Sequence, residues 1–362
     1  MSEYKKRVLV APLDWGLGHA TRCIPIIQEF LLQNAEVIIA GYGRSLYLLK
    51  KEFPSLQCIH FEGVSVNYPS DGSFAWTIIR QLSKILKNFR NEHKLLQKLI
   101  NENNIEIVIS DSRHGLFSKN IPSIFLLSQV RILLPSSLKI FEPFVAWMNK
   151  QYMKKYSECW IPDYSSERNL AGRLTHNISL PKNTFYIGPL SRMKKNEIQE
   201  KDIDVLAVLS GPEPQRTIFE EILFEQMKAT TLRCVIVRGK TEEAVTTKFN
   251  NVTFYSSMAT EQLQEIISRS KYVFSRSGYS TVMDFAAMSI SAIFIPTPEQ
   301  TEQEYLAAIL KKQKICYSEI QKDLSLLRAI EQSKSYSGFT NFPNTREELK
   351  KRIHALLNTG NS

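Results

Sequence analysis

Glycine and histidine residues follow the first apolar run of the sequence at a spacing that suits ligand binding. The stretch KKRVLVAPLDWGLGHATRCIPI (residues 5–26) contains a strand-like run, then Gly16 and Gly18, then His19 and a helical pattern. Glycines permit a tight turn and close approach of a ligand, and the first N–H groups of a helix attract anions. His19 could act there as a general base, or it could simply pack at the start of the helix. The dinucleotide fingerprint GxGxxG lacks its third glycine, which disfavours NAD binding.

A second group of polar residues lies in YVFSRSGYSTVMDFAAMSISAIFIPTPEQTEQEYLAAIL (272–310). One predicted strand ends in the turn 275–278, and the helix that follows carries Asp284. The next strand ends in PTPEQTEQEY, which opens another helix. A Ser/Gly turn suits a phosphate, and a carboxylate suits ribose hydroxyls. Each element alone could be an ordinary turn or an exposed helix start, but two adjacent strand ends of this kind favour a ligand site.

A third group, SDSRHG (110–115), follows another predicted strand. Asp111 and His114 could contact an acceptor or orient a base, and an ordinary turn between strand and helix is an equal alternative. We rank both residues second to His19 as candidates for catalysis.

The elements that must position these groups alternate along nearly the whole chain. The apolar runs are near-continuous, as in parallel strands covered by helices on both faces. We expect strands at 7–12, 35–41, 56–61, 105–110, 123–128, 184–189, 204–211, 233–239, 252–255, 272–277 and 291–296. We expect helices at 20–33, 74–103, 137–157, 214–228, 259–269, 279–289, 300–313 and 345–357. Two series of βα units predict an α/β protein with two doubly wound domains, whose ligands bind at the carboxyl ends of the strands.

The domain boundaries follow from the same pattern. We place an N-terminal domain at 1–190, a C-terminal domain at 191–342, and a final helix within 343–362 that could pack back on the N-terminal domain. The polar stretch 188–202 reads as the linker.

Composition narrows the class of protein. The 362 residues are 43% hydrophobic and include five scattered cysteines, none at CxxC spacing, which favours a reducing cytosol and argues against a zinc site. No apolar run is long enough for a membrane span, and the start of the sequence has no signal-peptide pattern. We therefore expect a cytoplasmic protein.

The net charge of +10 falls mostly in residues 1–190, which predicts an anionic partner. The segment 77–99 is rich in lysine and arginine, and 139–156 mixes lysines with Phe, Trp and Tyr. Both could be ordinary solvated helix faces. They could also lie on an anionic bilayer, so we expect peripheral attachment to the inner face of the cell membrane as one possibility.

Four stretches carry a resemblance to a known family. SRSGYSTVMDFAAMSISAIFIPTPEQTEQEY (275–305) resembles the nucleotide-sugar motif of the MurG-type, family 28 UDP-sugar transferases. GLGHATR (16–22), LSGPEPQR (209–216) and FYSSMA (254–259) resemble the first glycine loop, the diphosphate loop and the base-binding segment of the same superfamily. Two further segments resemble those of predicted glycosyltransferases from Bacteroidetes-type bacteria, namely APLDWGLGHATRCIPI and SKNIPSIFLLSQ.

The resemblance implies a GT-B fold, with two Rossmann-like domains facing each other across a cleft. The N-terminal domain would bind the acceptor and the C-terminal domain the nucleotide sugar, with UDP as the expected nucleotide. His19 would be the general base. By the same resemblance, the donor-binding residues would be Gly16, Gly18, Arg192, Ser210, Gly211, Phe254, Tyr255, Met258, Arg276, Ser277, Gly278, Asp284, Gln303 and Glu304.

Within that set the resemblance implies distinct roles. Asp284 would hold the ribose, where the family usually has Glu. The Ser/Gly turns would approach the diphosphate, with Arg192 and Arg276 as partners of the phosphates. Phe254 and its neighbours would line the base pocket. Gln303 and Glu304 fall where the family has a Gln pair on the sugar.

The implied function is transfer of a sugar from a nucleotide diphosphate donor to an acceptor hydroxyl, on a lipid or lipid-linked glycan in one reading. The reaction requires no metal and no cofactor, because helix starts and arginines can stabilise the leaving diphosphate. The one DxD, at Asp202 and Asp204, precedes a strand and lies at the wrong edge for ligands.

Other functions stay open at this point. A nucleotide-sugar hydrolase or an epimerase of the same fold would have a similar loop. A basic nucleic-acid-binding protein is the alternative of another class, but no nucleic-acid motif is present and we expect no such partner. The donor sugar, the acceptor, inversion or retention, and the oligomeric state are not fixed by the sequence.

Overall fold

The computed structural model describes residues 4–14, 16–63, 74–195, 200–240, 245–340, 342–343 and 346–359, and only the backbone of residues 74–83 and 85. Contacts divide the chain into two compact units. The first unit is Met1–Leu190 with Thr345–Ser362, and the second unit is Ser191–Asn344.

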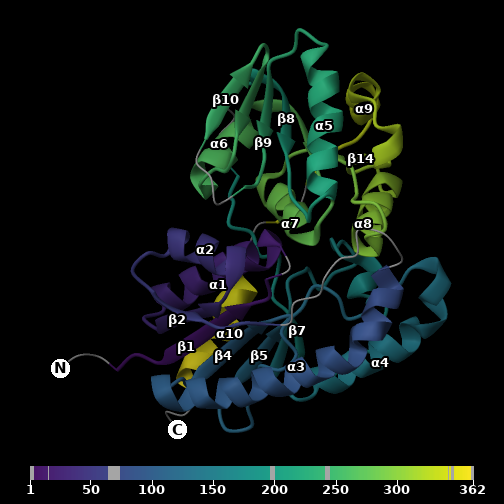
Figure 1. Ribbon diagram of the computed structural model, residues 1–362. Coiled ribbons are helices and arrows are strands. Elements are labelled where there is room, and N and C mark those ends of the chain that lie inside the picture. Colours follow the sequence, from purple (N-terminus) through teal and green to yellow (C-terminus); the bar gives the residue numbers. More distant parts are fainter. Residues whose placement is uncertain are drawn as a thin grey trace. The chain divides into compact units, whose positions relative to one another are not determined.

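The first unit is built on a parallel sheet of seven strands in the order β3-β2-β1-β4-β5-β6-β7 (Figure 1). The strands are β1 Arg7–Pro12, β2 Glu36–Gly41, β3 Gln57–His60, β4 Ile107–Asp111, β5 Ser123–Leu126, β6 Glu158–Ile161 and β7 Thr184–Tyr186. The helices are α1 Leu17–Leu32, α2 Gly43–Glu52, α3 Phe74–Asn103, α4 Glu142–Met153 and α10 Glu347–Asn358, with 3-10 turns η1 Ser136–Phe141 and η2 Gly172–Leu174. Leu9 and Ala11 of β1 pack with Leu96 of α3, so one face of the sheet is covered by that helix.

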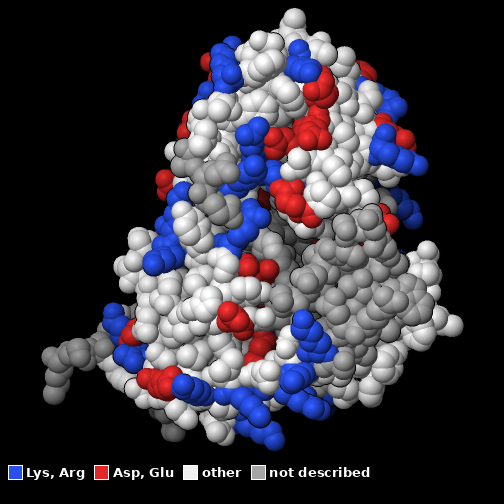
Figure 2. All heavy atoms as spheres, viewed as in Figure 1, with Lys and Arg blue, Asp and Glu red and all other residues white. Residues whose placement is uncertain are grey.

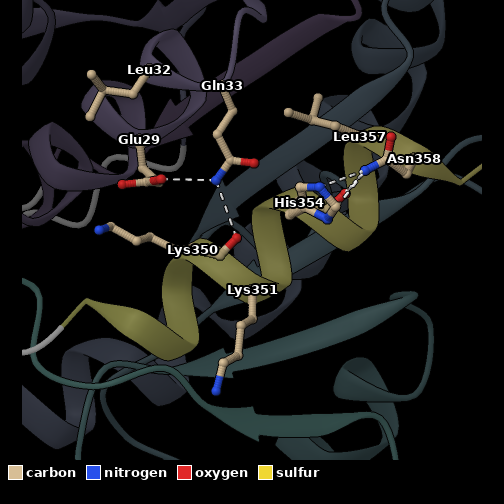
Figure 3. Close-up of a pocket in the computed structure, with 8 residues that line it drawn as sticks. All are labelled: Glu29, Leu32, Gln33, Lys350, Lys351, His354, Leu357 and Asn358. Carbon is tan, nitrogen blue, oxygen red and sulfur yellow. Dashed lines mark hydrogen bonds between the residues drawn. The ribbon is translucent and has the colours of Figure 1, made fainter.

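The last helix returns to the first unit. Helix α10 lies beside the end of α1, where Gln33 Nε2 donates to the carbonyl of Lys350 at 3.2 Å (Figure 3). The guanidinium carbon of Arg352 lies 3.5 Å from the ring centre of Phe185. Residues of both helices line a hollow of about 770 Å³. They are Glu29, Leu32, Gln33, Lys350, Lys351, His354, Leu357 and Asn358.

The second unit repeats the architecture with the order β10-β11-β9-β8-β12-β13-β14. Its strands are β8 Ile203–Val208, β9 Cys234–Val237, β10 Thr246–Phe249, β11 Val252–Tyr255, β12 Ser270–Ser275, β13 Ile293–Phe294 and β14 Tyr317–Ser318. Its helices are α5 Gln215–Lys228, α6 Thr260–Arg269, α7 Tyr279–Met288, α8 Thr301–Lys312 and α9 Leu326–Ser333, with the turn η3 Gln321–Asp323. Only β10 is antiparallel to its neighbour among the described strands.

The expected pair of doubly wound α/β domains is confirmed, and the differences have local causes. The pattern missed α2, β6, β10, α9 and β14. Strand β10 is exposed along its length and β14 has two residues, so neither has an apolar run to recognise. Strand β6 follows directly on a long helical pattern, and the helix expected at 137–157 divides into η1 and α4.

No helix in the described part of the chain is long and apolar enough to cross a membrane.

Candidate active site

The sheet of the first unit brings together two groups that the sequence holds far apart. Strands β1 and β4 are neighbours, so the loop after β1 and the end of β4 meet at one carboxyl edge. His19 lies in the first turn of α1, and its Nδ1 is 3.2 Å from Oδ2 of Asp111, the last residue of β4. This contact joins two of the three residues that we expected to be catalytic.

Arg22 completes the cluster. Its Nε donates to Asp111 Oδ2 at 2.9 Å, and its Nη2 donates to Asp111 Oδ1. The same Nη2 lies 3.0 Å from Ser112 Oγ and 2.9 Å from His19 Nδ1. Arg22 was not among the residues that we expected to be functional. Its spacing of three residues from His19 was the available signal, because positions i and i+3 share a helix face.

Burial and charge set the state of this cluster. The side chain of Asp111 is fully buried and that of Arg22 nearly so, whereas the ring of His19 is 19% exposed. Burial raises the pKa of Asp111, but the charges and hydrogen bonds of Arg22 and His19 outweigh it and lower the pKa to about 2. The carboxylate is therefore ionised at neutral pH, beside an imidazole that solvent can reach.

The loop after β1 leaves open space beside Gly16. Gly16 has φ +92°, and a Cβ there would meet no atom within 4 Å. Asp14 ties the loop to the neighbouring one, since its Oδ1 accepts from the backbone N–H of Ser45 at 2.8 Å. Gly43 has φ +57°, and a Cβ there would lie 2.1 Å from Asp14 Oδ2, so only glycine fits. Helix α1 begins with no side-chain cap, and Gly18 lies in its first turn.

The structure does not bring His114 to this cluster. Its ring stacks on Phe89 at 5.0 Å and meets Phe125 and Tyr152 edge-on, and Nε2 lies 3.2 Å from Asn149 Oδ1. Burial lowers the pKa of His114. This environment is that of a packed aromatic cluster, and we do not carry His114 into the proposed mechanism.

In the second unit the expected Ser/Gly turns lie at the carboxyl ends of neighbouring strands. Ser210 and Gly211 follow β8, and Ser277 and Gly278 follow β12, which pairs with β8. Gly211 has φ +105°. Gly278 precedes α7, and a Cβ there would meet no atom within 4 Å. The backbone at both turns is thus suited to close approach of an anion.

Gln303 organises the edge of this site. Its Oε1 accepts from the N–H of Thr297 at 2.9 Å, and its carbonyl accepts from Ser277 Oγ at 2.7 Å. The Oγ1 of Thr297 is buried and has no hydrogen-bond partner among the described residues, and it lies 3.8 Å from where a Cβ of Gly211 would be. Thr297 was not among the residues predicted to contact the donor. Glu304 is exposed, accepts from the N–H of Glu299 at 3.0 Å, and lines a hollow of about 760 Å³ beside α8.

Arg276, which we expected to bind phosphate, is held by other groups of the protein. Its Nη1 donates to the carbonyls of Ile295 and Pro296 at 3.0 and 3.1 Å. Its Nη2 donates to the carbonyl of Gln215 at 2.8 Å and to Gln321 Oε1 at 2.6 Å. The side chain is 1% exposed, and burial lowers its pKa to about 9. Arg276 thus joins the segment after β13 to the starts of α5 and η3 with all four Nη hydrogens, and contact with a phosphate stays a prediction.

The residues expected to line the base pocket differ in their exposure. The ring of Phe254 is 6% exposed and belongs to the core, where it packs edge-on against Phe224. Because side chains alternate along β11, Tyr255 points to the other face and is half-buried, as is Met258. Tyr255 and Met258 remain candidates.

Asp284 has partners from the start of the second unit. Its Oδ1 accepts from Ser191 Oγ at 2.6 Å, and Ser191 Oγ accepts from the N–H of Met193 at 2.9 Å. Arg192 is beside it and donates from Nη1 to Thr260 Oγ1 at 3.1 Å. Burial raises the pKa of Asp284. Asp284 therefore fixes residues 191–193 to α7, and contact with a ribose stays a prediction.

Among the described residues, no group of three or more His, Cys, Asp and Glu could hold a metal ion. Both carboxylates of the DxD are paired. Asp202 accepts from Arg269 at 2.6 Å, and Asp204 from Lys271 at 2.8 Å.

Comparison with known proteins identifies similar sequences. Residues 205–356 match the glycosyltransferase family 28 C-terminal domain. Two uncharacterized glycosyltransferases of Methanosarcina acetivorans are 23% and 25% identical to this chain. They cover 96% and 84% of it, and 98% and 81% of their own lengths.

Solved structures show the same fold. The glycotransferase of kitacinnamycin superposes with a TM-score of 0.61 at 13% identity, covering 98% of this chain and 95% of its own. Acinetobacter baumannii MurG superposes with 0.55 at 11% identity, covering 97% and 99%. Arabidopsis thaliana UGT89C1, complexed with UDP-L-rhamnose, superposes with 0.57 at 14% identity, covering 97% and 94%.

These comparisons confirm the GT-B fold and, through the family match and the relatives, the expected enzyme class of glycosyltransferase. The expected relation to Bacteroidetes-type proteins is not supported, since the curated relatives found come from Methanosarcina.

The buried ion pair generates a prediction about stability. Arg22→Ala leaves the fully buried carboxylate of Asp111 without its strongest partner, which costs about 3–5 kcal/mol of the free energy of unfolding. Arg7→Ala is the matched control, because the Arg7–Glu36 pair is half-exposed and contributes about 1 kcal/mol or less. Urea unfolding of both variants measures the difference, and equal losses would contradict the assignment.

Proposed function

We propose that this chain transfers a sugar from a nucleotide diphosphate donor, with UDP as the nucleotide, to an acceptor hydroxyl, using His19 as general base. The observation that carries the proposal is the contact of His19 Nδ1 with the buried Asp111 carboxylate at the carboxyl edge of the first sheet. With Nδ1–H donating to Asp111, Nε2 is free to take a proton.

In the proposed reaction the sugar moves to the acceptor oxygen while the acceptor's proton moves to His19. The acceptor oxygen attacks the anomeric carbon of the sugar while its proton passes to His19 Nε2. The bond between the anomeric carbon and the diphosphate oxygen breaks, and the nucleoside diphosphate leaves with the electron pair. Asp111 stabilises the imidazolium that forms, and Arg22 keeps that carboxylate ionised throughout.

The second unit would hold the donor. The turns 210–211 and 277–278 offer backbone N–H groups to the diphosphate, and the start of α7 adds its dipole, so the leaving group can be stabilised without a metal. The family match over residues 205–356 supports this placement. Gln303 and the exposed Glu304 are the proposed sugar contacts, with Arg192 and Asp284 near the nucleoside.

A lipid or lipid-linked acceptor is supported by the surface of the first unit. Ile140, Phe141, Phe144 and Trp147 are between 52% and 83% exposed on η1 and α4, and we call them the apolar patch. Helix α3 contacts α4 through Phe89 and Tyr152. Its described exposed side chains include Lys84, Lys87, Arg90, Lys94 and Lys98, and Figure 2 shows Lys and Arg side chains along the lower edge of the molecule. Exposed aromatic side chains next to basic ones favour an anionic bilayer surface.

Kinetics test the role of His19. His19→Ala removes the proton acceptor, so kcat for transfer should fall by about 10²–10⁴-fold. UDP affinity by calorimetry should not change, because His19 belongs to the other unit. Release of UDP from a panel of UDP-sugars, with and without lipid-linked acceptors, measures the rate. Full activity in the variant would contradict the proposal, and UDP release without any glycoside product would instead select a hydrolase.

Binding tests the donor site separately. Gly278→Ala fits the fold, because φ is −64° and the added methyl meets no protein atom within 4 Å. A bound diphosphate would meet that methyl, so UDP binding should weaken by about 1–3 kcal/mol at an unchanged melting temperature. Unchanged calorimetric affinity would place the diphosphate elsewhere.

Flotation tests the membrane surface. The double variant Phe144→Ser/Trp147→Ser should lose most of its binding to vesicles of phosphatidylglycerol, because it removes two of the three aromatic side chains of the apolar patch. Leu327→Ser is the control, since Leu327 is 60% exposed in the second unit. Wild-type protein that stays in the bottom fraction at low salt would contradict the membrane proposal.

A further inference from the structure

The atoms around Arg22 Nη2 pose a question of hydrogen placement. A guanidinium nitrogen of this kind carries two hydrogens. At least three acceptors are in reach, namely Asp111 Oδ1, Ser112 Oγ and His19 Nδ1. Two hydrogens cannot serve three acceptors, so one acceptor receives no hydrogen from Nη2. If that acceptor is His19 Nδ1, the imidazole carries its own proton there, and if it is Ser112 Oγ, the imidazole carries its proton on Nε2.

Two arrangements are possible. The ionised Asp111 keeps one hydrogen, so the second goes to either Ser112 or His19. If it goes to His19, Nδ1 is an acceptor and its lone pair faces Asp111 Oδ2 at 3.2 Å, which is repulsive. Nε2 then carries the proton and cannot act as a base. If the second hydrogen goes to Ser112 Oγ at 3.0 Å, Nδ1–H can donate to Asp111 and Nε2 is free.

The backbone conformation of Ser112 is one that a serine rarely adopts, so the surrounding structure must hold this residue in place. It follows β4 with φ +58°, a left-handed conformation that is unfavourable for a serine and persists only where the surrounding structure maintains it. Its N–H donates to the carbonyl of Leu126 at 3.0 Å, which anchors this turn to β5. The result is a hydroxyl oxygen held at Arg22 Nη2.

We propose that Ser112 is a positioning residue whose hydroxyl, by accepting from Arg22, keeps the proton of neutral His19 on Nδ1. The inference rests on the proposed role of His19 as base, and it assigns the selection of the active tautomer to Ser112. Asp111 alone does not select it, because Arg22 competes for the same imidazole nitrogen.

Ser112→Gly is the decisive variant. Glycine adopts φ +58° readily, so the melting temperature should stay the same or rise. Without the hydroxyl, the second hydrogen of Nη2 turns to His19 Nδ1. Ring ¹⁵N NMR of histidine-labelled protein should then show the proton moving from Nδ1 to Nε2. The His19 signals, among six histidines, are assigned with His19→Gln. We expect kcat to fall by at least about tenfold at unchanged KM.

Asn104→Gly is the matched control. Asn104 has φ +50°, is exposed, and precedes β4 in the same unit, so it should show the same effect on stability and none on the tautomer. Wild-type protein with the proton on Nε2, or Ser112→Gly with the proton still on Nδ1, would overturn the inference. The NMR result does not depend on turnover. A moved proton without loss of activity would therefore support the role of Ser112 and contradict instead the role of His19 as base.

Discussion

The buried ion pair between Arg22 and Asp111 is the constraint on which the candidate active site depends. Neither charge is stable alone in the interior, so each fixes the other. Asp111 ends a central strand and Arg22 lies on α1, and their pairing therefore sets the rotation of that helix over the sheet. His19 is one turn earlier on the same face, and so its imidazole is held against the carboxylate.

In the second unit the buried arginine, Arg276, has a different role from that of Arg22 in the first unit. Arg276 binds the carbonyls of Ile295, Pro296 and Gln215 and so fixes the strand ends, whereas the groups proposed to face the ligand there are backbone N–H groups at glycine turns. In the first unit, a side chain that can gain and lose a proton is presented to solvent. This division suits a reaction in which one unit moves a proton and the other stabilises a leaving diphosphate.

Much of this could be read from the sequence, for physical reasons. Near-continuous apolar runs identified most of the parallel strands, and strand ends followed by Gly, Ser or Asp identified the edges where His19 and Asp111 lie. The direction in which each side chain points, and the groups that it contacts, could not be predicted from the sequence. Phe254 and Arg276 are in the expected segments, but alternation along β11 and the carbonyls around Arg276 turn both inward. Arg22 was missed because its partner is distant in sequence.

Chemical rescue is the measurement that tests whether His19 removes the proton from the acceptor. His19→Ala protein, shown by calorimetry to bind UDP normally, would be assayed for glycosyl transfer with increasing imidazole. If His19 is the base, imidazole should restore part of the lost rate, and the restored rate should follow the neutral form of the added imidazole as pH is varied. Normal UDP binding with a rate that imidazole leaves unchanged would contradict the claim.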